Sequence, residues 1–570
     1  MMKIKQIKLE IKRLTRINNY YVFLRLISFI LMLIALYLGV NQHQNYYFLM
    51  LITLFLFILF VIKNQHNNNQ LQHQKYLLQT YLDNDARKND TWKTFKDDGS
   101  DLIQEDQYTC IDLDLLGPNS LFQYLSIAKT TLGRKKLAKS FLEVENKQQI
   151  LKKQAMIEEL SQNEDLIMNL IAYLKAIKFN KKQEFKFEPI KLTSIFIEII
   201  WILFVILHII SLIYMFVFNG HYAYSLIAYV GLLSLSLLMQ LKHNHLFHSY
   251  CQLYEDVKVY DQFFKQIVNH SFKDNELIKL QEKAKKCYQA SKALNQFLWL
   301  IHSRNNLIFY LLANGFLGID LLIVRLLHHW YQQYISDFKQ HYEVIAQYEI
   351  LISYANLAYV KKQTCIPTIS DKVHLEFKDL YHPLINENKV QANSFNSNHN
   401  VIMISGSNMS GKTTFMRTIG INLVLFLNGA RICARSANFS LFHIYTSIKI
   451  NDNLSEGIST FYQEILRMKQ IVEKSKIKQP TLILIDEIFK GTNYDDRILC
   501  SKTIIDLLHQ DHLITMITTH DFALCEIDYV DNYHFNQTFD HQKMIFDYQI
   551  KKGINKNSNA LALLHMVGID

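Results

Sequence analysis

Four long runs of apolar residues constrain this chain more than any other feature of its sequence. The first pair covers residues 24–40 and 46–62, and the second pair covers residues 195–218 and 222–241. A helix needs about 20 apolar residues to cross the hydrocarbon core of a bilayer. Buried core helices are the alternative, but a soluble core helix rarely lacks a polar face over such a length. The runs therefore predict two transmembrane helical hairpins.

The charges that flank these runs predict which side of the membrane each segment faces. Residues 3–16 carry six Lys or Arg residues, whereas the short linkers 41–45 and 219–221 carry none. Lys and Arg concentrate in cytoplasmic segments. We therefore expect a multi-pass protein of the plasma or inner membrane, with both termini and the segment between the hairpins in the cytoplasm.

A fifth apolar run, residues 307–327, contains Asn314, Asp320 and Arg325, which are costly in lipid. We expect it to form a buried helix of a soluble domain. Only 16 glycines and 5 prolines occur in 570 residues, which favours long helices over turn-rich β architectures. The seven cysteines form no CxxC pair, which argues against a disulfide framework or a zinc site.

The segment 401–422, VIMISGSNMSGKTTFMRTIGIN, contains the pattern G-x4-G-K-T between a strand-like run and a helix expected from Thr414 onward. Such a loop turns its backbone N–H groups toward phosphates at a helix N-terminus. Lys412 would contact the β- and γ-phosphates, and the Thr413 hydroxyl would bind Mg²⁺. The predicted nucleotide-binding residues of the loop are Gly406, Ser407, Asn408, Met409, Ser410, Gly411, Lys412, Thr413 and Thr414.

Two further strand-like runs end in residues suited to phosphate hydrolysis. The run 481–487 ends in Asp486 and Glu487, and the run 513–520 ends in His520. Asp486 would bind Mg²⁺, Glu487 would orient the attacking water, and His520 would reach the γ-phosphate. A solvated strand end and a surface histidine are the alternatives, but open α/β sheets bind ligands at the carboxyl ends of their strands. The sequence thus predicts Mg²⁺-dependent ATP hydrolysis with Lys412, Glu487 and His520 as catalytic residues.

These motifs resemble those of the MutS mismatch-repair ATPases of the ABC superfamily. The loop SGSNMSGKTTFMR is similar to the family's GPNMGGKST-x-MR, and DEIFKGTNYDD at 486–496 resembles DEIGRGTSTYD. DNLSEGISTFYQE at 452–464 is similar to D-D-L-x-x-G-x-STF-x-x-E, and FDYQIKKG within 546–570 resembles F-x-Y-K-L-x-x-G. The resemblance implies a homodimer through the ATPase domains, with Ser459 contacting the ATP of the opposite subunit. It also implies that Tyr548 stacks on adenine, whereas the opposing ring, expected near Val390, is missing.

A weaker resemblance covers residues 114–160, which are similar to the start of the family's helical lever domain. The expected architecture has three parts. Residues 1–90 hold a basic segment and the first hairpin. Residues 100–380 form an all-α lever domain that the second hairpin interrupts. Residues 381–570 form an α/β P-loop ATPase domain of the ABC type.

Two departures from the family shape the expected function: a predicted membrane hairpin interrupts the lever at residues 195–241, and the segment before the lever is short. About 100 residues precede the lever-like segment, and nearly half of them are predicted membrane helix, so we expect no direct mismatch sensing. Phe141-Leu142-Glu143 has the letters of the family's Phe-x-Glu wedge but lies inside the lever-like helix.

Three hypotheses follow. The first is a membrane-anchored, nucleotide-gated DNA clamp that contacts phosphates without reading sequence, through runs such as Lys181-Lys182, Lys283-Lys285-Lys286 and Lys361-Lys362. The second is a membrane-remodelling or transport ATPase, although the LSGGQ signature is lacking. The third is an ATP-gated scaffold for an unknown protein partner. The net charge of +10 permits contact with nucleic acid or anionic lipid and does not choose between them.

Overall fold

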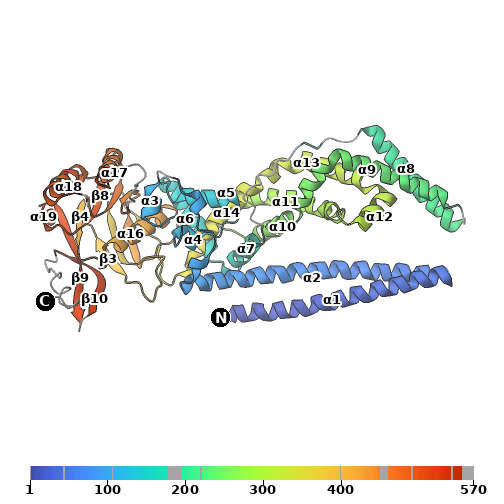
Figure 1. The fold of residues 1–570 in the computed structure, drawn as a ribbon, viewed down its shortest axis with the longest axis horizontal. Helices are drawn as coiled ribbons and strands as arrows, with labels where there is room; N and C mark the ends of the chain where they lie inside the picture. Colours follow the sequence, from blue (N-terminus) through green and yellow to red (C-terminus); the bar gives the residue numbers. More distant parts are fainter. Residues whose placement is uncertain are drawn as a thin grey trace. The chain divides into compact units, whose positions relative to one another are not determined.

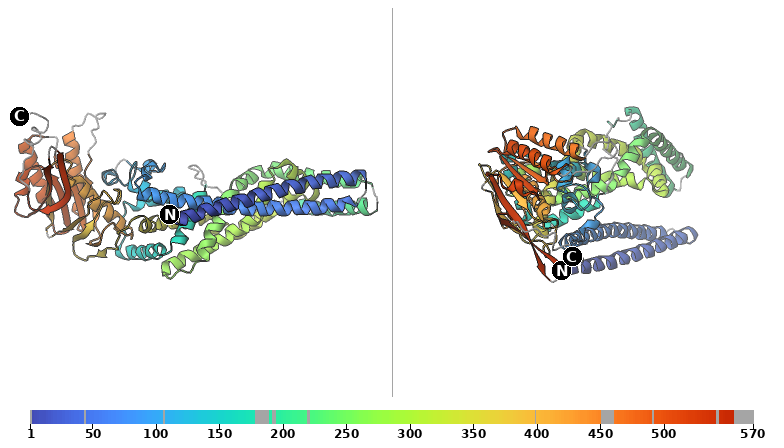
Figure 2. Two further views of the ribbon diagram at one scale, coloured as in Figure 1. Left: turned by 90° about the horizontal axis from the view of Figure 1, so that it is seen from below. Right: turned by 60° about the vertical axis from the view of Figure 1, so that its left-hand side comes forward.

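The computed structural model describes residues 2–42, 45–104, 107–177, 189–190, 194–218, 221–397, 399–449, 460–489, 492–540 and 543–554. The chain forms two compact units. The first unit comprises residues 1–81, 129–132 and 168–347, and the second comprises residues 82–128, 133–167 and 348–570. Figure 1 labels many of the elements of both units, and Figure 2 shows the chain from two further sides.

The structure thus divides the chain at other positions than the sequence boundaries near 90, 100 and 380. Residues 82–128 and 133–167 group with the strands of the C-terminal region, although they precede the second hairpin in the sequence. The helices of residues 168–347 form a separate unit.

The first unit is helical throughout its described residues. Helices α2, α7 and α14 cross the unit's limits, which lie after Tyr81, before Met168 and after Gln347. Its helices are α1 (Met2–Asn41), α2 (Tyr46–Lys88), α7 (Glu164–Ala176), α8 (Ile195–Val217), α9 (Ala223–Gln252), α10 (Tyr254–Val268), α11 (Asn275–Ser303), α12 (Leu307–Leu317), α13 (Ile319–Lys339) and α14 (His341–Ala355).

The four predicted apolar runs are helical. Helices α1, α2, α8 and α9 are, among the described residues, long and apolar enough to cross a membrane, and few of their apolar residues are buried inside the protein. Helices α1 and α2 pack against each other, with Asn67 donating a hydrogen bond of 2.9 Å to the Leu14 carbonyl and Phe29 contacting Phe57.

The expectation of one buried helix over residues 307–327 is wrong. The run breaks at Gly318 into α12 and α13, which are bent by 87°. Helix α13 contributes Ile323, Val324 and Trp330 to the core of the unit, where they pack with residues of α9 and α11. Most large apolar side chains of α12 are instead exposed. The cause is the left-handed backbone at Gly318 (φ +60°), which ends α12.

The second unit contains a six-stranded sheet in the order β10-β9-β4-β8-β7-β6 among its described residues. The strands β9, β4, β8, β7 and β6 are parallel, and β10 is antiparallel to β9. Strands β4, β7 and β8 confirm the three strands that the apolar runs predicted. The strand bounds are β4 (Val401–Ser405), β6 (His443–Ser447), β7 (Thr481–Asp486), β8 (Leu513–Thr519), β9 (Val530–Asp540) and β10 (Lys543–Lys552).

Both faces of this sheet are buried, as expected for parallel strands. On one face, Met403, Ile485 and Ile517 pack with Met468 of α17 and Ile505 of α18. The residues that alternate with them along the strands are buried as well, and α16 contacts β8. The bounds of these helices are α16 (Lys412–Leu427), α17 (Thr460–Ser475) and α18 (Tyr494–Leu508), and the short helix α19 (Phe522–Cys525) follows β8.

A smaller sheet and the segment before the second hairpin complete the unit. The sheet has the order β1-β5-β2-β3, from β1 (Thr368–Ile369), β2 (Leu375–Leu380), β3 (Asn393–Asn396) and β5 (Ser436–Phe439). Arg134 is buried and forms ion pairs of 2.7 Å with both Asp97 and Asp101. The helices here are η1 (Trp92–Thr94), η2 (Ser100–Leu102), α3 (Tyr108–Asp112), α4 (Leu121–Leu125), α5 (Thr131–Ser140), α6 (Lys147–Ser161) and α15 (Leu357–Val360).

Candidate active site

The glycine-rich loop joins the end of β4 to the start of α16. Gly411 has a φ of +106°, and a Cβ atom there would lie 3.2 Å from the ring of Tyr548. Only glycine combines this backbone with such a close neighbour. The loop therefore turns sharply into the helix, and the N-terminus of α16 faces the loop, as the G-x4-G-K-T pattern predicted.

Lys412 lies at the centre of this loop. Its Nζ donates hydrogen bonds to the carbonyl oxygens of Gly406 (2.7 Å) and Ser407 (3.0 Å), and it lies 3.3 Å from Nε2 of His520. Only 5% of the residue is exposed. The amine is thus held between the loop and His520, the residue that follows β8.

Nε2 of His520 is a meeting point for the predicted site. It lies 2.9 Å from Oδ1 of Asn408 and 3.1 Å from Oε1 of Glu487, in addition to Lys412. If Nε2 carries a proton, it donates to Asn408 or Glu487, and if it does not, it accepts from Lys412. The residues that follow β4, β7 and β8 therefore meet at this one nitrogen, each within hydrogen-bond distance of it.

Asp486 lies at the end of β7 and faces the loop. Its Oδ2 accepts a hydrogen bond of 2.8 Å from Thr413, and its Oδ1 accepts one of 2.6 Å from Thr518. A hydroxyl beside a carboxylate is the oxygen-rich donor set that Mg²⁺ prefers. The sequence reading missed Thr518, whose hydroxyl also accepts a hydrogen bond of 3.1 Å from the Glu487 N–H. The signal that could have revealed Thr518 is its position near the end of the predicted strand, two residues before His520.

Glu487 adopts a positive φ of +57°, which is uncommon for a residue with a side chain. Its backbone N–H also lies 3.2 Å from the Thr518 carbonyl oxygen. This conformation is held from β8 and turns the carboxylate toward His520. Backbone strain of this kind is typical of functional sites.

A cavity of about 490 Å³ opens beside the loop. Tyr548 lines it because β10 has a bulge between Phe546 and Ile550, and bulges re-aim side chains. Val390 lines the same cavity, so the position at which a second ring was expected is aliphatic. Predicted residues that line the cavity are Ser407, Asn408, Met409, Gly411, Lys412, Thr413, Thr414, Glu487 and Tyr548.

Two further hydroxyls of the loop bear on whether phosphate oxygens fit. Oγ of Ser410 is buried and has no hydrogen-bond partner among the described residues. Ser407 donates a hydrogen bond to Oε1 of Gln537 on β9, a residue that the sequence reading did not single out. A buried unpaired hydroxyl costs free energy, and a ligand oxygen would remove that cost.

His382 also lines this cavity and is almost fully buried. Burial lowers the pKa of its imidazole from 6.5 to about 4, so the ring is neutral at pH 7. Its Nδ1 accepts a hydrogen bond of 3.2 Å from the Leu384 N–H. A neutral ring at this position adds no charge to the cavity.

The segment Asp112–Asp114 joins the lever-like region to the nucleotide loop's surroundings. Asp112 accepts hydrogen bonds from the N–H groups of Ile448 (3.1 Å) and Lys449 (2.8 Å), just after β6. Asp114 forms ion pairs with Arg417 of α16 (3.0 Å) and with Lys449 (2.7 Å). These two carboxylates therefore connect the helix that follows the loop with the strand end that precedes residues 450–459.

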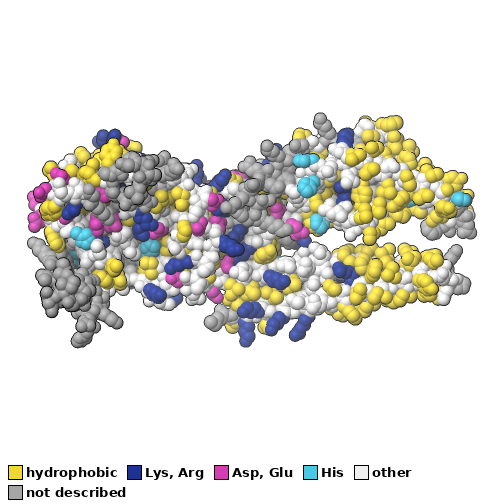
Figure 3. All heavy atoms as spheres, viewed as in Figure 1, with side chains coloured by type: hydrophobic (Ala, Val, Ile, Leu, Met, Phe, Trp, Pro, Cys, Tyr) yellow, Lys and Arg dark blue, Asp and Glu magenta, His cyan; other side chains and the backbone are white. Residues whose placement is uncertain are grey.

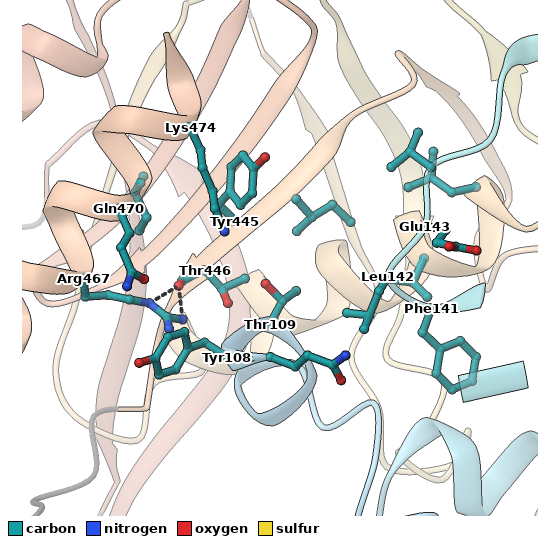
Figure 4. A pocket seen from close by; sticks show the side chains of 16 residues that line it. Tyr108, Thr109, Phe141, Leu142, Glu143, Tyr445, Thr446, Arg467, Gln470 and Lys474 are labelled. Carbon is teal, nitrogen blue, oxygen red and sulfur yellow. Dashed lines mark hydrogen bonds between the residues drawn. The ribbon is translucent and has the colours of Figure 1, made fainter. Parts of the chain in front are cut away.

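A second cavity, of about 260 Å³, lies between α3, β6 and α17. Figure 4 shows Arg467 at one end of it, with its guanidinium hydrogen-bonded to the Thr446 carbonyl and beside Tyr108. The guanidinium carbon lies 3.6 Å from the Tyr108 ring centroid. Nη1 of Arg467 is buried without a hydrogen-bond partner among the described residues.

Several other predicted residues lie apart from this site. Ser459 falls outside the described residues, as do Lys181 and Lys182. Lys361 is buried, its amine lies 5.1 Å from the ring centroid of Tyr124, and burial lowers its pKa. The prediction that Lys361 contacts phosphates is therefore wrong, because its amine is enclosed by the protein. The side chains of Lys283, Lys285 and Lys286 are exposed on α11.

The C-terminal region of the chain is similar to known proteins. The family model of MutS domain V matches residues 402–570. The chain is 28% identical over 247 residues to MutS protein homolog 4 of Mus musculus, covering 40% of this chain and 25% of the relative. It is 29% identical over 236 residues to the DNA mismatch repair protein MutS of Listeria welshimeri, covering 39% of this chain and 27% of the relative.

The DNA mismatch repair protein MutS of Flavobacterium psychrophilum is 28% identical over 255 residues, which is 42% of this chain and 29% of that protein. The chain thus matches between a quarter and three tenths of the length of these relatives. The similarity covers the C-terminal region.

Proposed function

We propose, from the premise that residues 402–570 are a MutS-family domain V, that this chain is a membrane-anchored ATPase. The observation that carries the proposal is the convergence of Lys412, Asn408 and Glu487 on Nε2 of His520. The loop, the acidic strand end and the histidine each come from a different strand, and phosphoryl-transfer sites of P-loop proteins are assembled in this way.

In the proposed reaction, Lys412 exchanges the carbonyls of Gly406 and Ser407 for phosphate oxygens. Thr413 and Asp486 would hold Mg²⁺, which would neutralise charge on the phosphates when bound. Glu487 orients the attacking water, and His520 links that carboxylate to the loop. The unpaired hydroxyl of Ser410 supports the fit of an anion here.

We further propose a homodimer through the ATPase domains, in which Ser459 completes the site of the partner subunit. The support is the resemblance of segment 452–464 to the family pattern. The contacts of Asp112 and Asp114 with the flanks of residues 450–459 and with α16 support coupling within the second unit. A nucleotide that shifts α16 relative to β6 would bias residues 112–114, which lead into the lever-like segment.

Anchoring rests on the four apolar helices α1, α2, α8 and α9. Their exposed apolar side chains would otherwise lie in water, at a cost of about 25 cal/mol per Å² of apolar surface. Figure 3 shows hydrophobic side chains gathered over α8 and α9 and over the outer parts of α1 and α2. From the Lys and Arg residues that flank the apolar runs, we propose that both termini and the ATPase region lie in the cytoplasm.

We propose that ATP binding and hydrolysis gate a clamp that binds DNA without reading its sequence. Lys283, Lys285 and Lys286 on α11 are the exposed basic group that supports phosphate contact. The second candidate is an ATP-driven membrane-remodelling machine or protein scaffold, which the exposed apolar surface of α8 and α9 favours.

The ATPase proposal is tested with the full chain in lipid nanodiscs. Glu487→Gln should bind ATP as the parent does but hydrolyse it about 10²- to 10⁴-fold more slowly, because the water loses its base. Glu143→Gln is the matched control, since that exposed carboxylate pairs with Lys139 at 2.9 Å and does not line the cavity beside the loop. Turnover by Glu487→Gln at the parent rate would contradict the assignment.

The DNA proposal is tested on the same nanodiscs with ATP-locked Glu487→Gln protein. Duplex DNA should bind with an affinity that falls as salt rises, and the triple replacement of Lys283, Lys285 and Lys286 by Ala should lower the salt slope. Replacement of Lys3, Lys5 and Lys8 by Ala is the control of equal charge. No binding at low salt would favour the remodelling or scaffold alternative.

A further inference from the structure

Helix α12 presents an apolar surface that the sequence reading assigned to a soluble core. Its residues Leu307 and Ile308 are 70% and 69% exposed, and Leu312 is 54% exposed. Monomeric soluble proteins seldom expose a contiguous apolar patch of this kind. In Figure 3 the hydrophobic side chains continue over the region of α8, α9 and α12. The exposed surface of α12 is therefore part of a larger apolar surface.

The contacts of α12 place it against the second hairpin. Nε1 of Trp201 on α8 donates a hydrogen bond of 2.8 Å to the Leu317 carbonyl, and the Tyr229 hydroxyl on α9 donates one of 3.2 Å to the Leu311 carbonyl. The ring of Phe316 packs against His208 of α8 and against Tyr229. These partners lie within the apolar stretches of α8 and α9. Where the hairpin lies in lipid, α12 lies in lipid beside it.

The two polar residues on either side of the bend do not face that surface. Asn314 and Asp320 are both fully buried. Asp320 accepts hydrogen bonds of 2.7 and 2.9 Å from Arg304 and one of 3.3 Å from Asn314, and its own N–H donates to Asn314 Oδ1 at 2.9 Å. Non-helical backbone is tolerated at membrane depth only where protein encloses it. The bend at Gly318 meets this condition, because the indole of Trp201 packs directly on it.

We propose that α12 is a re-entrant membrane segment, seated in the acyl chains of the leaflet on the side from which α8 enters. Eleven residues of helix span about 16 Å, roughly half of the hydrocarbon core, so α12 enters the bilayer without crossing it. Helix α13 then returns on the same side, where Arg325 pairs with Glu198 at 3.5 Å near the start of α8. This inference rests on the proposed anchoring by α8 and α9.

The test is spin-label accessibility in the full chain, reconstituted in phosphatidylcholine–phosphatidylglycerol vesicles. Cys251, Cys365 and Cys500, the partly exposed cysteines, are first replaced by serine. A nitroxide is then placed in turn at Leu312 on α12, at Ile210 on α8 and at Lys283 on α11. Ile308 serves as a second α12 position, and both α12 side chains are exposed, so neither label displaces a packed residue.

Labels at Leu312 and Ile308 should collide more often with O₂ than with a water-soluble Ni²⁺ chelate, as the Ile210 label does, while Lys283 shows the reverse. If the α12 labels behave like Lys283 while Ile210 remains in lipid, the re-entrant segment is refuted and the anchoring stands. If Ile210 also reports water, the anchoring fails and the inference falls with it.

Discussion

Arg467 of α17 donates a hydrogen bond of 2.9 Å to the carboxylate of Asp112, which is 1% exposed at the end of α3. The same carboxylate accepts a hydrogen bond of 2.7 Å from the Thr446 hydroxyl on β6. One buried charge therefore joins α3 to the edge strand β6 and to helix α17 of the second unit. Arg467 also lines the cavity that Figure 4 shows.

Asp112→Ala should destabilise the second unit. The substitution leaves the buried guanidinium of Arg467 without its counter-charge, and loss of one partner of a buried ion pair costs about 3–5 kcal/mol. The measurement is chemical unfolding of the detergent-solubilised protein. Asp371→Ala is the control, because Asp371 is exposed and its pair with Lys147 contributes little. Equal stability of the two variants would show that Asp112 does not hold these elements together.

Lys412→Ala should weaken ATP binding about 10- to 100-fold, since a hydrogen bond to a charged group contributes about 1.5–3 kcal/mol. A fluorescent ATP analogue titrated against the protein measures the affinity. Lys389→Ala provides the comparison, because Lys389 lines the same cavity but is exposed. A similar loss for both variants would mean that cavity charge alone, and not the loop lysine, binds the phosphates.

Tyr548→Ala should weaken binding of adenine nucleotides by about 0.5–1.5 kcal/mol, because a stacked ring is lost. Tyr548→Phe keeps the ring and should bind as the parent does. Val390→Tyr offers a second ring across the cavity and should tighten binding. Isothermal titration with ADP measures all three variants, and an unchanged affinity in Tyr548→Ala would remove the stacking role.

The buried ring of His382 predicts a pH dependence of stability. Its pKa is about 4 in the folded protein, against an ordinary value of 6.5. Between these pH values the unfolded chain binds a proton that the folded protein does not. The ring's contribution is therefore fully present above pH 6.5 and is lost as the pH falls toward 4, at up to about 1.4 kcal/mol per pH unit.

His382→Asn keeps an acceptor for the Leu384 N–H but removes the titrating group. The free energy of unfolding of the parent should thus fall more steeply than that of the variant as pH is lowered from 7 to 4.5. Curves that stay parallel over this range would show that the folded environment leaves this imidazole unaffected.

The sequence was informative where one local pattern determines the structure. Strands β4, β7 and β8 were predictable because a buried parallel strand reads as a short apolar run, and each run ended in a polar group. The G-x4-G-K-T pattern likewise specified the turn into α16. The four long apolar helices were predictable from the length of the apolar runs alone.

Features that depend on distant partners were not predictable. Asp112 and Thr446 are 334 positions apart, and no periodicity links them. The run 307–327 reads as one apolar helix, because nothing local shows that Asn314 and Asp320 share a buried network with Arg304. The orientation of the Tyr548 side chain depends on a bulge in β10, which arises where β10 pairs with β9.

The imidazole of His520 has three neighbours around one nitrogen, and that nitrogen holds either one proton or one lone pair. It can satisfy only a single neighbour at any moment. A phosphate that draws Lys412 away, or a partner that pulls Asn408 aside, must change which contact survives. Which of the three hydrogen bonds His520 forms therefore depends on which group is bound at the loop.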